Sequence, residues 1–226
     1  MTVSIYADGA DLNRMDEYAH DTRISGFTTN PSLMKKQGIK DYPSFARQVL
    51  RASNAKPVSF EVLADDFETM EVQARAIAGW GKNVYVKIPI TNTKGESSIP
   101  LIERLQYDSI KVNVTAVFTM RQIDLARAVM REGIISIFAG RIADTGRDPM
   151  FTVKYAKEYN KVPEVKILWA SAREVFNVYQ AEQAGADIVT ITPDLIAKLE
   201  LHGKDLTQYS LETVQMFFRD GEGVAL

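Results

Sequence analysis

A lysine within a mostly apolar segment is the residue of this sequence whose type and setting say most about chemistry. Lys87 lies in segment 83–88, which alternates like a barrel or sheet strand. Removing an ammonium from water disfavours its charged form, and a neutral lysine amine can form Schiff bases with carbonyl compounds. The structural alternative is an ion pair with Glu61 or Asp8 and no chemistry.

Polar side chains also recur at the ends of the other apolar segments. Alternate residues of a strand share a face, so Glu61 lies on the face opposite to Phe60, and Thr115 shares a face with Asn113. Unpaired polar groups are costly inside a protein, so such a set indicates a functional site. The candidates that we expect to converge are Asp8, Thr28, Asn30, Glu61, Lys87, Asn113, Thr115, Ser136 and Ser171.

A second cluster, residues 140–148, is bracketed by glycines and carries Arg141 and Arg147. Guanidinium groups suit a phosphate, and Ser171 and Arg173 follow the next expected strand. Phosphates often bind in this part of a (β/α)₈ barrel. The alternative is a surface loop with Arg–Asp pairs, which we favour for Arg147.

The elements that must position these groups alternate between short apolar runs and longer segments of helical periodicity, as repeated βα units do. Eight such units in this length favour an α/β fold, a (β/α)₈ TIM barrel, over an open doubly wound sheet. The expected strands are 3–8, 24–29, 57–63, 83–88, 109–116, 134–138, 166–170 and 187–191.

Helical periodicity is clear in 66–80, 120–131, 149–159 and 173–184, with Thr119 and Asp148 as N-caps. Residues 210–220 predict an extra C-terminal helix, which would either cover the barrel or reach another subunit. We therefore expect a single barrel domain over 1–226, of which 204–226 form a helical tail.

The composition excludes several classes of function. A net charge of −2 gives no general attraction for nucleic acid or an anionic membrane, and no run of about 18 apolar residues exists. There is no cysteine and there are only two histidines, so we expect neither a thiolate site nor a multi-histidine metal site. With no basic and apolar leader at its start, the chain is expected to be cytoplasmic.

The chain resembles the transaldolase family, specifically its small single-barrel branch, which also contains fructose-6-phosphate aldolase. The resemblance covers nearly the whole chain. It is carried by Thr28-Thr29-Asn30-Pro31-Ser32, Val86-Lys87-Ile88-Pro89, Asn113-Val114-Thr115-Ala116-Val117-Phe118, Phe138-Ala139-Gly140-Arg141-Ile142 and Ala170-Ser171-Ala172-Arg173.

The resemblance implies roles for individual residues of this chain. Lys87 would attack a ketose carbonyl, Asp8 would act as the acid and base at the C4 hydroxyl, and Glu61 with Thr115 would hold a proton-shuttling water. No cofactor or metal is implied. The implied substrate-binding residues, which would hold a sugar phosphate, are Thr28, Asn30, Asn113, Ser136, Phe138, Arg141, Ser171 and Arg173.

Two positions look like the transaldolases of this branch, which have Glu at 61 and Phe at 138, where the aldolase has Gln and Tyr. They favour transfer of a dihydroxyacetone unit between sugar phosphates over simple cleavage. The alternatives are an aldolase that releases dihydroxyacetone and a non-catalytic barrel that binds sugar phosphates. Gly9 departs from the Ser or Thr that usually follows the aspartate. The branch generally forms rings, so we expect a homo-oligomer, a pentamer or decamer.

Overall fold

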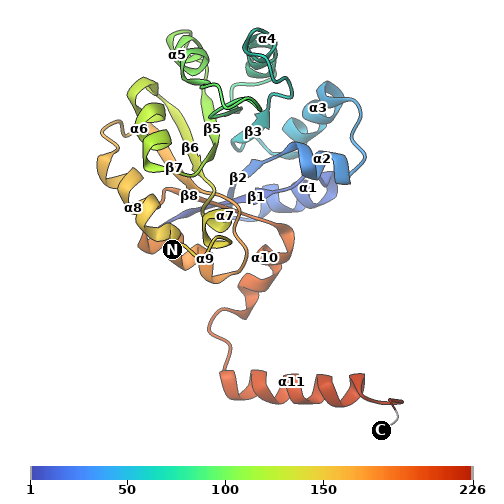
Figure 1. Cartoon of the computed structure of the whole chain (residues 1–226). Helices are drawn as coiled ribbons and strands as arrows, with labels where there is room; N and C mark the ends of the chain where they lie inside the picture. Colours follow the sequence, from blue (N-terminus) through green and yellow to red (C-terminus); the bar gives the residue numbers. More distant parts are fainter. Residues whose placement is uncertain (1, 225–226) are drawn as a thin grey trace.

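The computed structural model describes residues 2–224, and in this part of the chain eight parallel strands close into a barrel in sequence order (Figure 1). The predicted α/β barrel is therefore confirmed. The strands are β1 (Ser4–Asp8), β2 (Ile24–Thr28), β3 (Val58–Glu61), β4 (Val84–Pro89), β5 (Val112–Val117), β6 (Gly133–Ile137), β7 (Val165–Trp169) and β8 (Ile188–Ile191).

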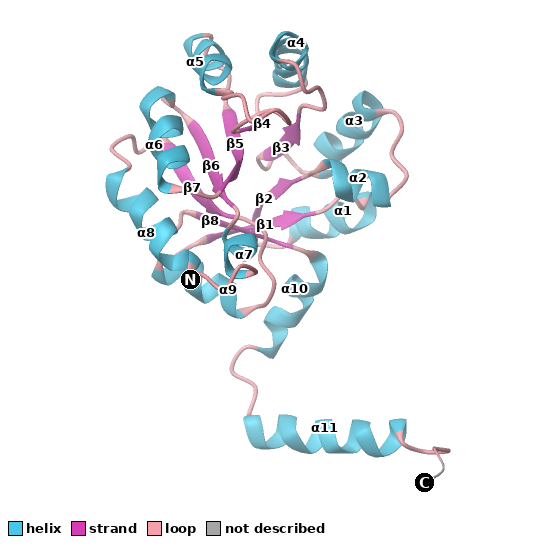
Figure 2. Ribbon diagram, in the orientation of Figure 1, coloured by secondary structure: helices cyan, strands magenta, loops and turns pink. Residues whose placement is uncertain are grey.

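Helices follow the strands and form an outer ring around the barrel (Figure 2). A short 3₁₀ turn, η1 (Leu199–Leu201), leads out of the ring into the C-terminal segment. The helices are α1 (Leu12–His20), α2 (Pro31–Lys36), α3 (Tyr42–Ala52), α4 (Phe67–Ala78), α5 (Ile99–Tyr107), α6 (Met120–Val129), α7 (Ala139–Ala143), α8 (Pro149–Tyr159), α9 (Phe176–Gln183), α10 (Pro193–Lys198) and α11 (Leu206–Asp220).

The core between strands and helices is built from the apolar face of each strand. Val58 and Phe60 of β3 and Val86 of β4 are completely buried there, and their polar neighbours in sequence face the barrel interior. Local signals fix the helix starts. Thr119 forms a capping box with Gln122 at the start of α6, and Asp148 caps α8, as expected.

Two expected boundaries within the barrel are wrong by three residues each. The segment expected as a helix from 173 becomes α9 only at Phe176, because the Asn177 side chain accepts hydrogen bonds from the backbone N–H groups of Arg173 and Glu174. The fifth strand starts at Val112 rather than at 109, since Ser109 has a φ of 57° and belongs to the preceding turn. Neither difference changes which residues reach the barrel mouth.

The C-terminal helix does not cover the barrel. The helix α11 starts earlier than expected, at Leu206 with Asp205 as its N-cap, and extends away from the ring of helices (Figure 1). No residue of α11 is buried, and Phe217 and Phe218 are 63% and 73% exposed. The last two residues of the expected tail, 225 and 226, lie outside the described residues, as does residue 1.

The loops after β6 and β7 lie in unusually close contact. Ser171 has a φ of 63°, and a Cβ atom at Gly140 would lie only 1.6 Å from its carbonyl oxygen. Gly140 therefore allows α7 to sit directly against the β7–α9 loop. This contact sets the distance between Arg141 and Ser171 at the mouth of the barrel.

We expect Gly140→Ala to lower the free energy of unfolding by about 3 kcal/mol, because the added methyl group requires backbone movement. Urea unfolding of the purified proteins measures the change. Gly79→Ala is the matched control, because the backbone of Gly79 is helical and an added Cβ atom there would lie 3.4 Å from the nearest non-neighbouring atom, an ordinary van der Waals distance. Equal stability of the two variants would contradict the close contact.

Candidate active site

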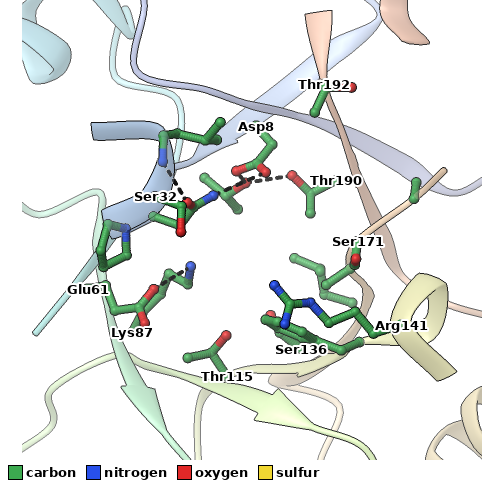
Figure 3. A pocket seen from close by; sticks show the side chains of 18 of the residues that line it. Asp8, Ser32, Glu61, Lys87, Thr115, Ser136, Arg141, Ser171, Thr190 and Thr192 are labelled. Carbon is green, nitrogen blue, oxygen red and sulfur yellow. Dashed lines mark hydrogen bonds and ion pairs between the residues drawn. The ribbon is translucent and has the colours of Figure 1, made fainter. Parts of the chain in front are cut away.

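A cavity of about 480 Å³ opens at the carboxyl ends of the barrel strands. Figure 3 shows side chains from most of the strands and from the loops after them pointing into it. Eleven of the twelve residues expected from the sequence line this cavity: Asp8, Thr28, Asn30, Glu61, Lys87, Thr115, Ser136, Phe138, Arg141, Ser171 and Arg173. The remaining one, Asn113, does not.

Lys87 is only 6% exposed, and its amine makes two contacts. The Nζ atom lies 2.8 Å from Oε2 of Glu61 and donates to the backbone carbonyl of Thr29 at 2.8 Å. Glu61 is the direct neighbour of Lys87 in the register of β3 and β4, which explains the pairing. The amine thus has one carboxylate that can exchange a proton with it and remains accessible from the cavity.

Asp8 lies at the end of β1 and lines the same cavity as Lys87. Its Oδ1 accepts a hydrogen bond from the Thr28 hydroxyl at 2.8 Å, and its Oδ2 accepts one from the Asn30 amide at 3.4 Å. Burial raises the pKa of the Asp8 carboxyl, while the positive charge of Lys87 and these two hydrogen bonds lower it. A raised pKa makes this carboxyl a better proton acceptor than an ordinary exposed aspartate.

Thr115 carries a buried hydroxyl to which the described residues offer no hydrogen-bond partner. The side chain is 2% exposed and faces the cavity. The next residue, Ala116, has a φ of 57°, and the pairing of β5 with β6 is irregular between Val114 and Val117. This bulge redirects the strand end beside the site. An unpaired hydroxyl in a polar cavity is a place for a water or a substrate group.

Asn113 lies one layer deeper than expected. It is completely buried, accepts a hydrogen bond from the Ser136 hydroxyl at 2.7 Å and donates to the Ser59 hydroxyl at 3.1 Å. Ser136 itself lines the cavity. Asn113 therefore orients a side chain of the site from behind.

Arginine side chains occupy the opposite side of the cavity. Arg141 is exposed, points into the cavity, and its guanidinium lies 5.6 Å from the centroid of the Phe138 ring (Figure 3). Arg173 is also exposed and pairs with Asp144 at 2.6 Å. With Ser171, they form an open and positively charged end. Arg147 is exposed and outside the cavity lining, as a surface loop predicts.

Three polar residues of the cavity were not expected from the sequence: Ser32, Thr190 and Thr192. Thr190 of β8 shares a hydrogen bond of 2.6 Å with Thr28. Because Thr28 uses its only hydroxyl proton for Asp8, Thr190 must be the donor in this pair. Strand parity within β8 could have found Thr190, since it shares a face with Ile188 inside the barrel.

The arrangement combines a nucleophilic amine, two carboxylates and an anion-binding end in one cavity. Such a set suits covalent chemistry on a carbonyl compound that carries a phosphate. Among residues 2–224, no group of three or more His, Cys, Asp or Glu side chains could hold a metal. No helix in this range is both long and apolar enough to cross a membrane.

Comparison with solved structures shows the barrel fold. The chain superposes on a protein described as "Native KDPGal structure" with a TM-score of 0.57 at 12% identity, covering 84% of this chain and 83% of that one. It superposes on a putative phosphonomutase from Burkholderia cenocepacia with a TM-score of 0.59 at 12% identity, covering 97% and 94%.

Sequence comparison is more specific. The family model described as "Transaldolase/Fructose-6-phosphate aldolase" matches residues 5–224. A probable transaldolase of Nitrosopumilus maritimus is 34% identical over 98% of this chain and 96% of its own length. A probable transaldolase of a Sulfurihydrogenibium species is 35% identical over 98% of both chains. The chain belongs to the transaldolase/fructose-6-phosphate aldolase family.

Proposed function

We propose that the protein is a class I transaldolase that moves a dihydroxyacetone unit from a ketose phosphate, such as fructose 6-phosphate or sedoheptulose 7-phosphate, to an aldose phosphate. The observation that carries the proposal is the buried amine of Lys87, which lies 2.8 Å from the Glu61 carboxylate in a cavity that also holds Asp8. The reaction would take place in the cytoplasm, whose reducing conditions suit a chain without cysteine.

Schiff-base formation needs the neutral form of Lys87. Transfer of one proton along the 2.8 Å contact to Glu61 would free the amine for attack on C2 of the ketose. The resulting carbinolamine then loses its oxygen as water, and the proton returns through Glu61 to that leaving oxygen. A water held between Glu61 and the unpaired hydroxyl of Thr115 would extend this route.

Cleavage of the C3–C4 bond needs a base at the C4 hydroxyl. Asp8 would take that proton while the bonding electrons move into the iminium on Lys87, which leaves an enamine and an aldose phosphate. The reverse sequence with a second aldose phosphate completes the transfer: the enamine attacks the aldehyde and Asp8 returns the proton. Water then hydrolyses the new iminium.

The phosphate of either sugar would bind at the other side of the cavity. Among residues 2–224, Arg141 has no carboxylate partner, and Ser171 also lines this side of the cavity with its hydroxyl. Arg173 would have to share its guanidinium between Asp144 and the phosphate. Because the amine and the phosphate site would lie at separate ends of the cavity, an extended substrate would bind in one direction. Thr28, Asn30 and Ser136 would bind its hydroxyl groups.

The proposal predicts the products. Incubation with fructose 6-phosphate and erythrose 4-phosphate should yield sedoheptulose 7-phosphate, and neither this product nor free dihydroxyacetone should accumulate without the acceptor. Mass spectrometry identifies both. Release of dihydroxyacetone in the absence of an acceptor would favour the alternative, a fructose-6-phosphate aldolase. Absence of both products would contradict the proposed reaction on these substrates.

The lysine variants extend this experiment. Lys87→Ala should lower turnover by at least ~10³-fold, because Lys87 is the only lysine among the described residues that line the cavity. Lys111→Ala is the control: this lysine precedes β5 at the opposite end of the barrel and should leave turnover unchanged. A fully active Lys87→Ala variant would exclude the Schiff-base mechanism.

The environment of Asp8 predicts a change in pH dependence. The hydrogen bond from Thr28 lowers the pKa of Asp8, so Thr28→Val should raise that pKa and move the acid limb of kcat/KM to higher pH. A rise of the pKa by one unit, ~1.4 kcal/mol, would lower kcat/KM about ten-fold more at the acid end than at the alkaline end. A parallel decrease at every pH would contradict this role.

We also propose that the protein is a homo-oligomer, a pentamer or decamer, in which α11 contacts a neighbouring copy. Large apolar side chains along α11 and after it are exposed, which is unusual for a monomer. The most exposed are Leu206 (79%), Phe218 (73%), Val224 (74%), Phe217 (63%) and Val214 (59%).

Truncation after Gly203 tests this proposal. Light scattering of the full chain should give a mass of several subunits, and the truncated chain should give a smaller assembly, since the exposed apolar surface would be gone. Circular dichroism of the truncated chain controls for the barrel fold. An unchanged assembly would exclude α11 as the contact.

A further inference from the structure

The pairing of β2 with β3 ends just before the residue that contacts the lysine. The N–H of Phe27 donates to the carbonyl of Pro57 at 2.8 Å, and the N–H of Thr29 donates to the carbonyl of Ser59 at 3.1 Å. A parallel ladder advances by two residues, so the next rung would involve Glu61. Residue 31 would donate to the Glu61 carbonyl, and the Glu61 N–H would donate to the Thr29 carbonyl.

Neither of these bonds is made. Residue 31 is proline, which has no N–H, and it starts the helix α2. The carbonyl of Thr29 instead accepts the hydrogen bond from Nζ of Lys87 at 2.8 Å. The backbone N–H and carbonyl of Glu61 on this side therefore have no partner in the sheet, although Glu61 must hold its carboxylate in place.

Tyr42 supplies both missing partners. Its hydroxyl accepts a hydrogen bond from the Glu61 N–H at 2.8 Å and donates one to the Glu61 carbonyl at 3.0 Å. A phenol has one proton to donate, so this pair of bonds uses it fully. Burial raises the pKa of Tyr42, which keeps the phenol protonated and able to donate.

The ring of Tyr42 is itself fixed by packing. Tyr42 is the first residue of α3, and its ring meets Phe60 and Trp80 edge-on, with centroids 6.2 Å and 5.3 Å away. Phe60 precedes Glu61 in β3 and is completely buried. The hydroxyl is therefore held on a rigid base at the end of the strand.

We infer that Tyr42 is a positioning residue of the active site: its hydroxyl replaces the missing rung of the sheet and holds the Glu61 backbone, which keeps the carboxylate at 2.8 Å from Nζ of Lys87. The inference rests on the proposed function. It concerns the steps in which Glu61 exchanges a proton with Lys87, the formation and hydrolysis of the Schiff base. Substrate binding does not involve Tyr42, which lies outside the cavity lining.

The test is a double-mutant cycle between Tyr42→Phe and Glu61→Gln. Single-turnover reactions with fructose 6-phosphate are quenched with borohydride, and the rate of adduct formation on the peptide that contains Lys87 is measured. Tyr42→Phe should slow this rate about ten-fold when Glu61 is present and less than two-fold in the Glu61→Gln background, with KM little changed. Equal losses in both backgrounds, or no loss in either, would overturn the inference.

Two further variants keep a folding defect apart from this effect. Tyr155→Phe also loses hydroxyl contacts, to Asp124 at 2.9 and 3.0 Å, but far from the cavity, and should leave the adduct rate unchanged. Tyr42→4-aminophenylalanine keeps the ring and a donor to the Glu61 carbonyl, and should recover at least half of the lost rate. A folded Tyr42→4-aminophenylalanine variant as slow as Tyr42→Phe would overturn the inference.

Adduct formation measured on the unsubstituted protein distinguishes a failure of this inference from a failure of the proposed function. Adduct formation on Lys87 in the parent supports the Schiff-base mechanism whatever Tyr42 does. A parent that forms no adduct overturns both, and a parent that forms the adduct while the cycle shows no coupling overturns only the role of Tyr42.

Discussion

The burial of the Lys87 amine is the constraint on which this active site depends. An ammonium group that is almost completely removed from water needs compensating partners, and the barrel supplies them from the two strands that precede β4. Glu61 of β3 provides charge, and the backbone carbonyl of Thr29, directly after β2, provides an acceptor. The pairing of β2 with β3 is short, with residue pairs at Phe27–Val58 and Thr28–Ser59, and Pro31 cannot extend it because proline has no N–H. The Thr29 carbonyl at the end of this pairing is the one that accepts the hydrogen bond from Lys87.

A separate cluster of buried apolar side chains packs inside the barrel next to this polar site. Its members are Tyr6, Ile134, Leu168, Ala170 and Ile188. Space for the Tyr6 ring comes from β2, where a Cβ atom at Gly26 would lie within 2.6 to 2.8 Å of three ring atoms. Two of these residues, Leu168 and Ala170, also line the cavity. Burial is the largest influence on the pKa of Asp8, and it raises that pKa.

Charge is distributed unevenly across the cavity, and the distribution matches the proposed reaction. The amine and both carboxylates come from β1, β3 and β4, whereas Arg141 and Arg173 follow β6 and β7. The close contact at Gly140 holds the loops after β6 and β7 together, so that Arg141 and Arg173 lie at the same end of the cavity. A substrate with a carbonyl at one end and a phosphate at the other would therefore enter in one orientation.

Much of this protein follows from local regularities of its sequence, and some of it does not. The alternation of side chains in a strand has a period of two, so each apolar segment by itself indicated which polar groups face the interior, and the repeated βα pattern indicated a barrel. The partners of these groups depend on the register between strands that are distant in sequence. Only the tertiary structure decided that Glu61 rather than Asp8 pairs with Lys87 and that Asn113 lies behind Ser136. It also decided the direction of α11, because a helix without buried residues carries no local signal for where it lies.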